Sequence, residues 1–201
     1  MKRLFFTIKN LFKIVELRTK IFNTLFYLFV FRFGAFIVLP GVSPNLLTKK
    51  AQGLFGILDT FLGGAFSNAS ILGIGIMPYI SASIIIQLLT IMSPTFQRMQ
   101  KEGQSGRNKL NKITKFLTIG VAIVQSFGYT MSDTLSTPGL ILIPKYLFVV
   151  SSIFILVSGT MFCTWLGDRI TDKGIGNGIS MLIMVGIVSA LPRALFAEIL
   201  T

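Results

Sequence analysis

Five predominantly apolar stretches of 19 to 22 residues dominate the sequence, at 21–39, 72–92, 113–131, 145–166 and 178–196. An α-helix of about 20 residues rises about 30 Å, which matches the hydrocarbon core of a bilayer. Only 13% of the 201 residues are charged, against about 25% in a soluble domain. The sequence therefore predicts an all-α, polytopic bundle of five transmembrane helices. The first stretch is too long for a cleavable signal peptide, whose apolar core has about 7–15 residues, so we expect it to remain as a span.

A further apolar stretch, 54–66, is too short to cross a bilayer. Its 13 residues would rise less than about 20 Å as a helix. It carries Asp59 near its middle and Gly63-Gly64 near its end. Non-helical backbone at membrane depth is tolerated only inside protein or along a water-filled cavity. We therefore expect 54–69 to be a re-entrant segment, hinged at the two glycines; a helix packed permanently on the outer surface is the alternative.

The positive charge is unevenly distributed. The net charge is +12, and the segments 1–20, 94–115 and 167–177 hold 14 of the 19 Lys and Arg residues. Positive residues favour the cytoplasmic side of membrane proteins. This predicts a cytoplasmic N-terminus, a basic cytoplasmic loop at 94–112, a cytoplasmic turn at 167–177 and an external residue 201. The charge is thereby explained without direct nucleic-acid binding, and basic and aromatic residues do not interleave as on a nucleic-acid-binding surface.

The basic N-terminal segment has a second property. In 1–20, apolar residues recur at helical spacing between the Lys and Arg residues. Such an amphipathic helix lies in the headgroup plane of an anionic leaflet, so we expect anionic lipid as a partner.

Five spans also place the two chain ends on opposite sides of the membrane. Inverted repeats of channels and transporters need an odd number of spans, so the chain fits one half of a ten-span protein.

Two sequence stretches are the most distinctive. Ser70–Leu89 reads SILGIGIMPYISASIIIQLL and Trp165–Met184 reads WLGDRITDKGIGNGISMLIM. In the first, glycines and Pro78 suit a sharp turn into a helix, and polar side chains inside the span should face a partner helix or water. In the second, the spacing G-x-G-x-G differs from a dinucleotide-binding motif. It predicts a tight turn, with Asn177 capping the next helix and Asp168 and its charged neighbours solvated.

The residues for bond-making chemistry are missing. The sequence contains no His and a single Cys, Cys163, which removes the commonest general base and metal ligand and any disulfide within the chain. We find no candidate catalytic, metal-binding or cofactor-binding residues. The chain is therefore not expected to be an enzyme.

The two distinctive stretches resemble the SecY family, at the start of its second span and at its fourth-to-fifth-span turn. KEGQSGRNKLNKIT at 101–114 and FRFGAFIVLPGV at 31–42 are similar to further parts of the bacterial and organellar branch. The resemblance implies the first five spans of a ten-span protein-conducting channel in the bacterial plasma (inner) membrane. Such a channel translocates secretory polypeptides and inserts membrane proteins, and would be incomplete without spans 6–10.

The resemblance also implies roles for individual residues. The re-entrant segment corresponds to the plug that closes the resting pore, comprising Leu54, Phe55, Ile57, Leu58, Asp59, Phe61, Leu62, Gly63 and Gly64. The apolar pore ring corresponds to Ile76, Ile80, Ile183 and Ile187, two pairs at i, i+4, a spacing that by itself indicates ordinary helix packing. One side of the lateral gate corresponds to Ser81, Ile84, Gln87 and Gln125. Implied partners are the second half in the same or a separate chain, SecE, SecG, SecA or the ribosome on the cytoplasmic face, and the secretory or nascent polypeptide.

Arg32 lies within the first predicted span. A charge at the centre of a span costs about 2.5–3.5 kcal/mol on insertion scales. We expect its side chain to extend outward to water, or else to line the outer vestibule.

Three other functions would each require a feature that differs from those of a channel. Half of a solute transporter would place polar or charged groups near the midplane, where the second and fifth spans have isoleucine. An intramembrane enzyme would need a His, paired carboxylates or a Ser/Lys couple in the bilayer, and none is present. A purely structural subunit would differ from a channel in not crosslinking to a translocating chain through its second span.

Overall fold

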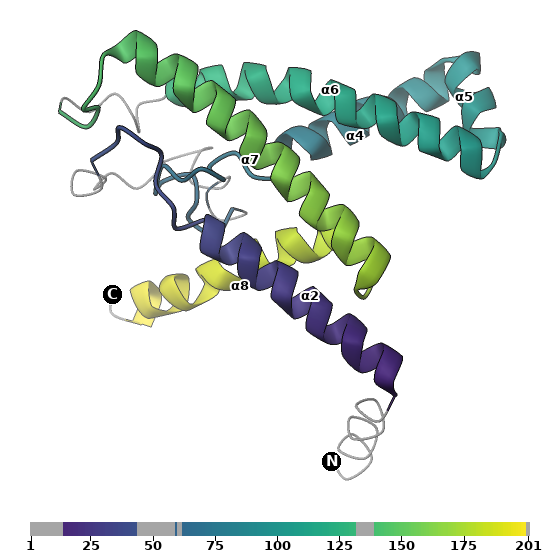
Figure 1. Ribbon diagram of the computed structural model, residues 1–201, viewed down its shortest axis with the longest axis horizontal. Coiled ribbons are helices and arrows are strands. Elements are labelled where there is room, and N and C mark those ends of the chain that lie inside the picture. The colour runs from purple at the N-terminus through teal and green to yellow at the C-terminus, as the bar shows by residue number, and fades with distance from the viewer. Residues whose placement is uncertain (1–13, 44–58, 60–61, 132–138, 200–201) are drawn as a thin grey trace.

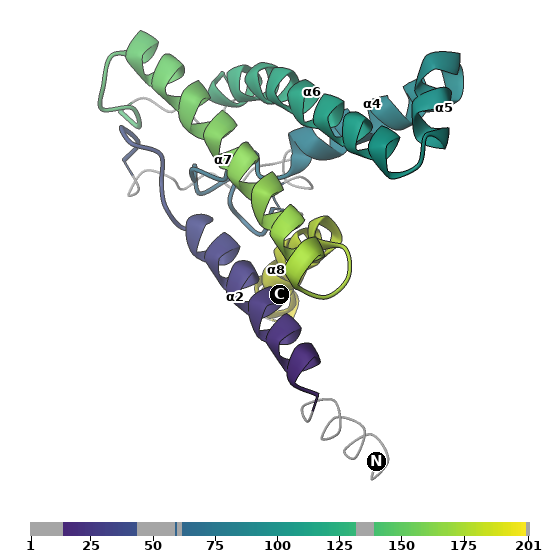
Figure 2. The same ribbon diagram turned by 45° about the vertical axis from the view of Figure 1, so that its right-hand side comes forward.

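The computed structural model describes residues 14–43, 59, 62–131 and 139–199, with side chains up to residue 189 in the last range. The helices are α2 (Val15–Gly34), α4 (Met77–Met92), α5 (Pro94–Lys101), α6 (Gln104–Thr130), α7 (Lys145–Lys173) and α8 (Gly178–Ile199). In Figure 1, α4 and α6 lie side by side, α7 crosses their inner end, and α2 and α8 lie beside the other half of α7. The non-helical residues 62–76 occupy the centre, where these helices converge (Figures 1 and 2).

The first predicted span, 21–39, is shifted in the structure. Helix α2 ends at Gly34, and the chain continues as turns that pair with distant backbone. The Leu39 amide donates to the Ala69 carbonyl and the Ile71 amide donates to the Ile37 carbonyl, both at 2.8 Å. The helix therefore ends five residues before the predicted end of the span, and the Ile37 carbonyl and the Leu39 amide pair with residues 71 and 69 instead. The predicted amphipathic segment 1–20 lies mostly outside the described residues.

The predicted cytoplasmic loop and turn are largely helical. After α4 the chain bends by 101° into α5, with Pro94 in the first turn of α5. Helix α6 then starts at Gln104, nine residues before the predicted span, and α7 continues to Lys173. The helices extend beyond the predicted spans because hydropathy marks the edge of the apolar layer, whereas Lys, Gln and Arg are good helix formers that continue a helix into water. At the other end, α4 starts at Met77 instead of residue 72, after turns that include Gly75 with φ +56°.

Residues that repeat every four positions form the contacts between helices. The buried positions are Pro78, Ala82, Ile86 and Thr90 on α4; Gly106, Leu110, Thr114, Thr118, Ala122, Ser126 and Thr130 on α6; and Phe148, Ser152, Leu156, Thr160 and Thr164 on α7. Most of these residues are small, which lets helix backbones approach closely in membranes. Several threonine hydroxyls donate to the carbonyl four residues earlier, as Thr118 does to Thr114 at 2.8 Å. The helices are thus joined by close packing along i, i+4 rows.

Large apolar side chains cover much of the outer surface. Phe22 and Phe29 on α2, Ile91 on α4 and Phe116 on α6 are each about 70–80% exposed, which suits contact with lipid or with another apolar element. Among the described residues, α7 alone is long and apolar enough by itself to cross a membrane, and α4 with α5 adds a second candidate if that bent pair is one span. The five-span count stays a prediction.

Substitution of Gly159 on α7 tests how closely this helix packs against the chain at Ile71. A Cβ atom there would collide with the Ile71 carbonyl oxygen, whereas one at Gly120 on α6 would meet no atom within 4 Å. We expect Gly159→Ala to lower the stability of the full-length protein by roughly 1–3 kcal/mol through overpacking. Gly120→Ala should be neutral or slightly stabilising, because Ala is the better helix former. Thermal unfolding in detergent measures both; equal transition temperatures would show that the contact at Gly159 is not tight.

Candidate functional site

The centre of the bundle is occupied by a non-helical part of the chain. Leu62, Ala65, Phe66, Ala69 and Ile74 are each at most 6% exposed and belong to one apolar cluster with residues of α6, α7 and the end of α2. The segment pairs much of its own backbone: the amides of Gly64 and Ser70 donate to the carbonyls of Asp59 and Ala65 at 2.9 and 3.1 Å. An irregular chain is therefore held inside the protein, as is required of irregular backbone at membrane depth.

Asp59 and two glycines shape this segment. The Asp59 carboxylate accepts hydrogen bonds from the Ser67 amide at 2.9 Å and from the Ser67 hydroxyl at 2.7 Å. Gly63 and Gly64 have φ of +63° and +87°, a region that glycine adopts without steric cost. Both glycines lie in turns of the structure; that they act as a hinge stays a prediction. Of the other residues assigned to the re-entrant segment, Leu62 is buried, whereas the predictions for Leu54, Phe55, Ile57, Leu58 and Phe61 lie outside the described residues.

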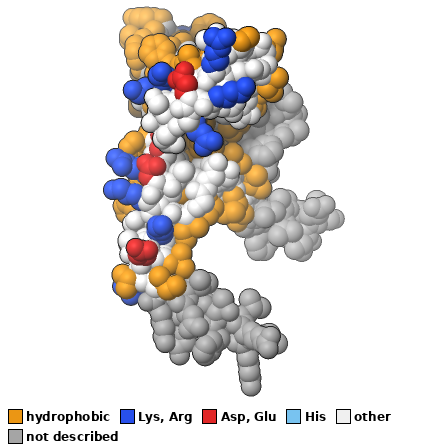
Figure 3. All heavy atoms as spheres, turned by 90° about the vertical axis from the view of Figure 1, so that its right-hand side faces the viewer, with side chains coloured by type: hydrophobic (Ala, Val, Ile, Leu, Met, Phe, Trp, Pro, Cys, Tyr) orange, Lys and Arg blue, Asp and Glu red, His pale blue; other side chains and the backbone are white. Residues whose placement is uncertain are grey.

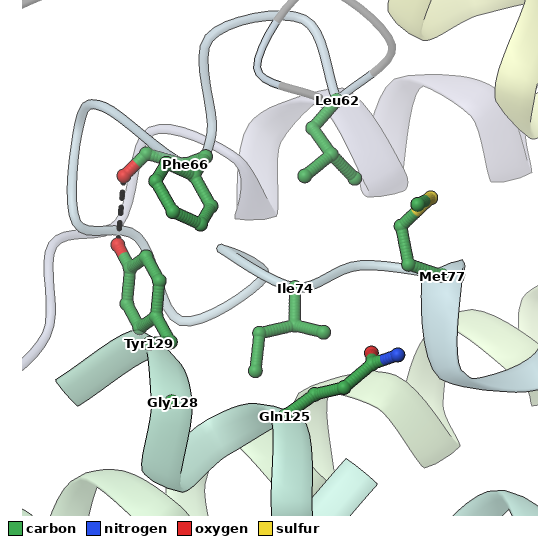
Figure 4. A pocket seen from close by; sticks show the side chains of 7 residues that line it. All are labelled: Leu62, Phe66, Ile74, Met77, Gln125, Gly128 and Tyr129. Atoms are coloured by element: carbon green, nitrogen blue, oxygen red, sulfur yellow. Dashed lines mark hydrogen bonds between the residues drawn. The ribbon is translucent and has the colours of Figure 1, made fainter. Parts of the chain in front are cut away.

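Side chains from two helices hold the segment by its carbonyl groups. Arg32 Nη1 on α2 donates to the Gly63 carbonyl at 2.8 Å. The Tyr129 hydroxyl on α6 donates to the Phe66 carbonyl at 2.7 Å, with the two rings in edge contact (Figure 4). Arg32 was expected to extend outward to water; it is instead half-buried and directed at Gly63, with its guanidinium also 4.9 Å from the centre of the Phe36 ring. A carbonyl in a nearby turn provides the acceptor that water would otherwise supply.

A pocket of about 280 Å³ lies between the segment and α6. Figure 4 shows Leu62 and Phe66 from the segment facing Ile74, Met77 and Gln125, with Gly128 and Tyr129 completing the lining. Gln125 was predicted to be a gate residue, and it is the one side-chain amide in this mostly apolar lining. Sequence reasoning missed Met77, Phe66 and Tyr129. A phenol inside an apolar span was the available signal for Tyr129, because a buried tyrosine hydroxyl needs a hydrogen-bond partner.

Three of the four predicted ring residues lie together. Ile76, immediately before α4, is 4% exposed, and it shares a cluster with Leu166, Ile170 and Leu182. Ile80 and Ile183 are partly buried and pack against the same cluster. Ile187 is half-buried one turn farther along α8 and lies outside this cluster of described residues. The structure thus brings the start of α4 against α8; that these residues form a constriction stays a prediction.

The remaining predicted gate residues lie along α4. Ser81 is half-buried, Ile84 is 51% exposed, and Gln87 is exposed with its Nε2 3.4 Å from the Ser83 hydroxyl. They do not share a cluster with Gln125, which lines the pocket on α6. Their exposure leaves this face of α4 open to another element.

The turn between α7 and α8 is held on both sides. Asn177 Oδ1 accepts hydrogen bonds from the amides of Ile179 and Ser180 at 3.0 and 3.4 Å, which confirms it as the cap of α8. Thr24 Oγ1 on α2 accepts from the Ile175 amide at 3.0 Å, and a Cβ at Gly174 would collide with this same Oγ1. The predicted tight turn is present, and glycine at position 174 allows the close approach to Thr24.

Asp168 differs from its prediction as a solvated charge. Its Oδ2 forms an ion pair with Lys115 Nζ at 2.6 Å, with both side chains about 40% exposed, and so joins α7 to α6. The neighbouring Arg169 guanidinium lies 5.4 Å from the centre of the Trp165 ring. Within the part of the chain that the structure describes, no group of three or more His, Cys, Asp or Glu residues could hold a metal ion.

Comparison with known proteins identifies the family. The family model described as SecY matches residues 70–201. The protein translocase subunit SecY 1 of Lactobacillus kefiranofaciens is 45% identical over 196 residues, which is 96% of this chain and 46% of the relative. SecY of Escherichia coli K12 is 45% identical over 90% of this chain and 42% of its own length, and SecY of Buchnera aphidicola subsp. Schizaphis graminum is 43% identical over 96% and 46%. The chain spans less than half the length of these relatives. It belongs to the SecY family.

Proposed function

We propose that this chain forms the first half of a protein-conducting channel, a passive pore and half of a lateral gate in the bacterial plasma (inner) membrane. Secretory polypeptides would cross through it, and membrane proteins would leave it sideways into lipid. The observation that carries the proposal is the buried re-entrant segment, held inside the bundle next to the point where the start of α4 meets α8. The matching relatives are named as protein translocase subunits. The chain itself would perform no bond-making chemistry.

The proposed pore ring consists of Ile76, Ile80, Ile183 and Ile187. An apolar constriction resists water and ions by dewetting. Apolar contact is also non-directional, so the same ring would fit closely around polypeptides of varied sequence. The partly buried state of Ile80 and Ile183 in this chain leaves them available to line a passage completed by the other half.

The proposed plug is the re-entrant segment, 54–69. Its described part is compact, being closed on itself by the Asp59–Ser67 hydrogen bonds, and it is attached to α2 and α6 by the Arg32–Gly63 and Tyr129–Phe66 hydrogen bonds. Positive φ at Gly63 and Gly64 provides a hinge. These features support a segment that seals the resting pore and moves aside when a polypeptide enters.

The proposed gate lies on α4 and α6. The open face of α4 that carries Ser81, Ile84 and Gln87 would pack against spans 6–10, in the same or a separate chain. Polar residues along such a seam separate more easily than an apolar seam when water or a signal sequence competes. A hydrophobic signal helix would then pass between the halves into lipid. Other exposed apolar surfaces would contact lipid, SecE and SecG.

The proposed orientation follows from where the basic residues lie. The start of α2, helix α5, the start of α6 and the end of α7 are at the same end of the molecule (Figure 1). Figure 3 faces this end and shows Lys and Arg side chains gathered over it. They include Arg98 and Lys101 on α5 and Lys173 on α7. The positive-inside rule places this end in the cytoplasm and residue 201 outside, so SecA or the ribosome would dock here, with anionic lipid around it.

The pore ring is tested by removing its side chains in the full-length channel. We expect Ile80→Gly and Ile183→Gly to raise the resting ion conductance of reconstituted channels several-fold, because a wider, less apolar constriction no longer dewets. Ile85→Gly is the control: it places the same helix-weakening residue on α4 at a 40% exposed position outside the ring. Conductance equal to that of the control would contradict the ring.

The plug is tested by deleting residues 57–67. The deletion should raise the resting ion conductance several-fold, because no segment closes the pore. It should also allow export of substrates with weakened signal sequences, because a substrate no longer has to displace the segment before it enters. Planar-bilayer conductance and an export assay measure the two effects. A deletion variant that stays tight and selective would contradict the plug.

The orientation is tested by cysteine labelling in intact cells. A cysteine replacing Lys109, whose side chain is 59% exposed, should react with a membrane-impermeant thiol reagent only after the cytoplasmic side is opened. A cysteine replacing Leu142, which is 71% exposed at the opposite end of α6, should react from outside. Cys163 is fully buried and should stay unlabelled in both. The reverse pattern would overturn the orientation.

A further inference from the structure

Gly63 lies where the re-entrant segment touches two helices at once. A Cβ atom at Gly63 would collide with Ser189 Oγ on α8, and it would lie 2.6 Å from Arg32 Nη1 on α2 and 3.0 Å from the Gly186 carbonyl oxygen on α8. Ser189 Oγ is itself fixed by donating to the Gly186 carbonyl at 2.7 Å. A Cβ atom here would therefore displace the Ser189 hydroxyl and the Arg32 guanidinium, and the φ of +63° also favours glycine.

Arg32 supplies the polar contact at this junction. Its Nη1 donates to the Gly63 carbonyl at 2.8 Å from a half-buried position. Hydrogen bonds from a charged donor are about twice as strong as neutral ones, and partial burial reduces the competition from water. The guanidinium also stays charged at every accessible pH. Of the two side chains that bind carbonyls of the segment, Arg32 and Tyr129, Arg32 is the charged one.

We propose that Arg32 is the positioning residue that holds the re-entrant segment closed, through the Gly63 carbonyl at the junction of α2 and α8. The proposal rests on the proposed channel function. The Tyr129–Phe66 hydrogen bond on α6 is a second, independent attachment three residues along the segment. The segment can leave the centre of the bundle only when both hydrogen bonds break.

The position of this junction on α8 links it to the pore ring. Gly186, whose carbonyl oxygen lies beside Gly63, follows Ile183 by three residues and so lies near the same face of α8. A polypeptide that pushes Ile183 outward would move the surface against which Gly63 rests. Loss of that support would weaken the Arg32 contact, so widening of the ring and release of the segment would occur together.

The test compares two identical substitutions on α2 in the full-length channel with its second half. Arg32→Gln removes the charged donor, and Arg18→Gln removes the same charge from an exposed position at the other end of the helix. We expect resting channel openings in planar bilayers to become on the order of tenfold more frequent for Arg32→Gln, which corresponds to about 1.4 kcal/mol, and to be unchanged for Arg18→Gln. Arg32→Lys keeps a charged donor and should fall between wild type and Arg32→Gln; equal opening frequencies for the Lys and Gln variants would contradict a charged hydrogen bond.

A second pair of variants keeps Arg32 in place. Gly63→Ala forces a side chain into the junction at φ +63°, whereas Gly176→Ala places Ala at φ +72° with no atom within 4 Å. We expect resting leak from Gly63→Ala only. If Arg32→Gln fails to accumulate in the membrane, this pair decides: leak from Gly63→Ala supports the proposal, and a tight seal overturns it.

Deletion of residues 57–67 distinguishes failure of the proposed plug from failure of the proposed role of Arg32. If the deletion variant leaks while Arg32→Gln opens no more often than Arg18→Gln, the plug stands and the role of Arg32 is wrong. If the deletion variant does not leak, the plug itself is wrong, and the role of Arg32 as its positioning residue is overturned with it.

Discussion

The need to pair every backbone polar group inside the membrane determines how this structure is built. Helices meet that need alone, whereas the irregular residues 62–76 cannot. Part of their backbone pairs within the segment, part pairs with Ile37 and Leu39, and two carbonyls bind Arg32 and Tyr129. The same need explains why α2 stops at Gly34: a helix continued to residue 39 would use up the backbone groups that Ala69 and Ile71 require. The apolar packing of α4, α6 and α7 then encloses the segment.

Sequence reasoning succeeded where one local property decides the outcome. The tight turn before α8 and its cap at Asn177 each depend on residues close together in the chain. Helix ends were predicted less well, because hydropathy reports where the apolar layer stops, and α6 and α7 continue beyond it. Contacts between distant residues were missed: nothing local to Lys115 indicates Asp168 as its partner, and nothing local to Arg32 indicates the Gly63 carbonyl.

The same difference between local patterns and distant contacts applies to the candidate site. The spacing of Ile76 and Ile80, and of Ile183 and Ile187, indicates one face of each helix but cannot indicate that the two faces meet; the family resemblance supplied that expectation. The structure places the first three in one apolar cluster and leaves Ile187 outside it. A ring that is only partly assembled in this chain is the expected result if other helices contribute its remaining side.

The re-entrant segment is held on some sides and not on others. Helix α2 and helix α6 donate hydrogen bonds to it, α8 supports Gly63, and α7 contributes Phe148 and Leu156 to its apolar cluster. Helix α4 follows the segment directly but turns an exposed face, with Ile84, Leu88 and Ile91, away from the bundle. A pore needs a wall on every side, because an apolar constriction excludes ions only when it is closed. The chain spans less than half the length of its matching relatives and leaves this apolar face exposed. In the proposed channel, a second set of helices would pack against α4, and the gate would open along that boundary.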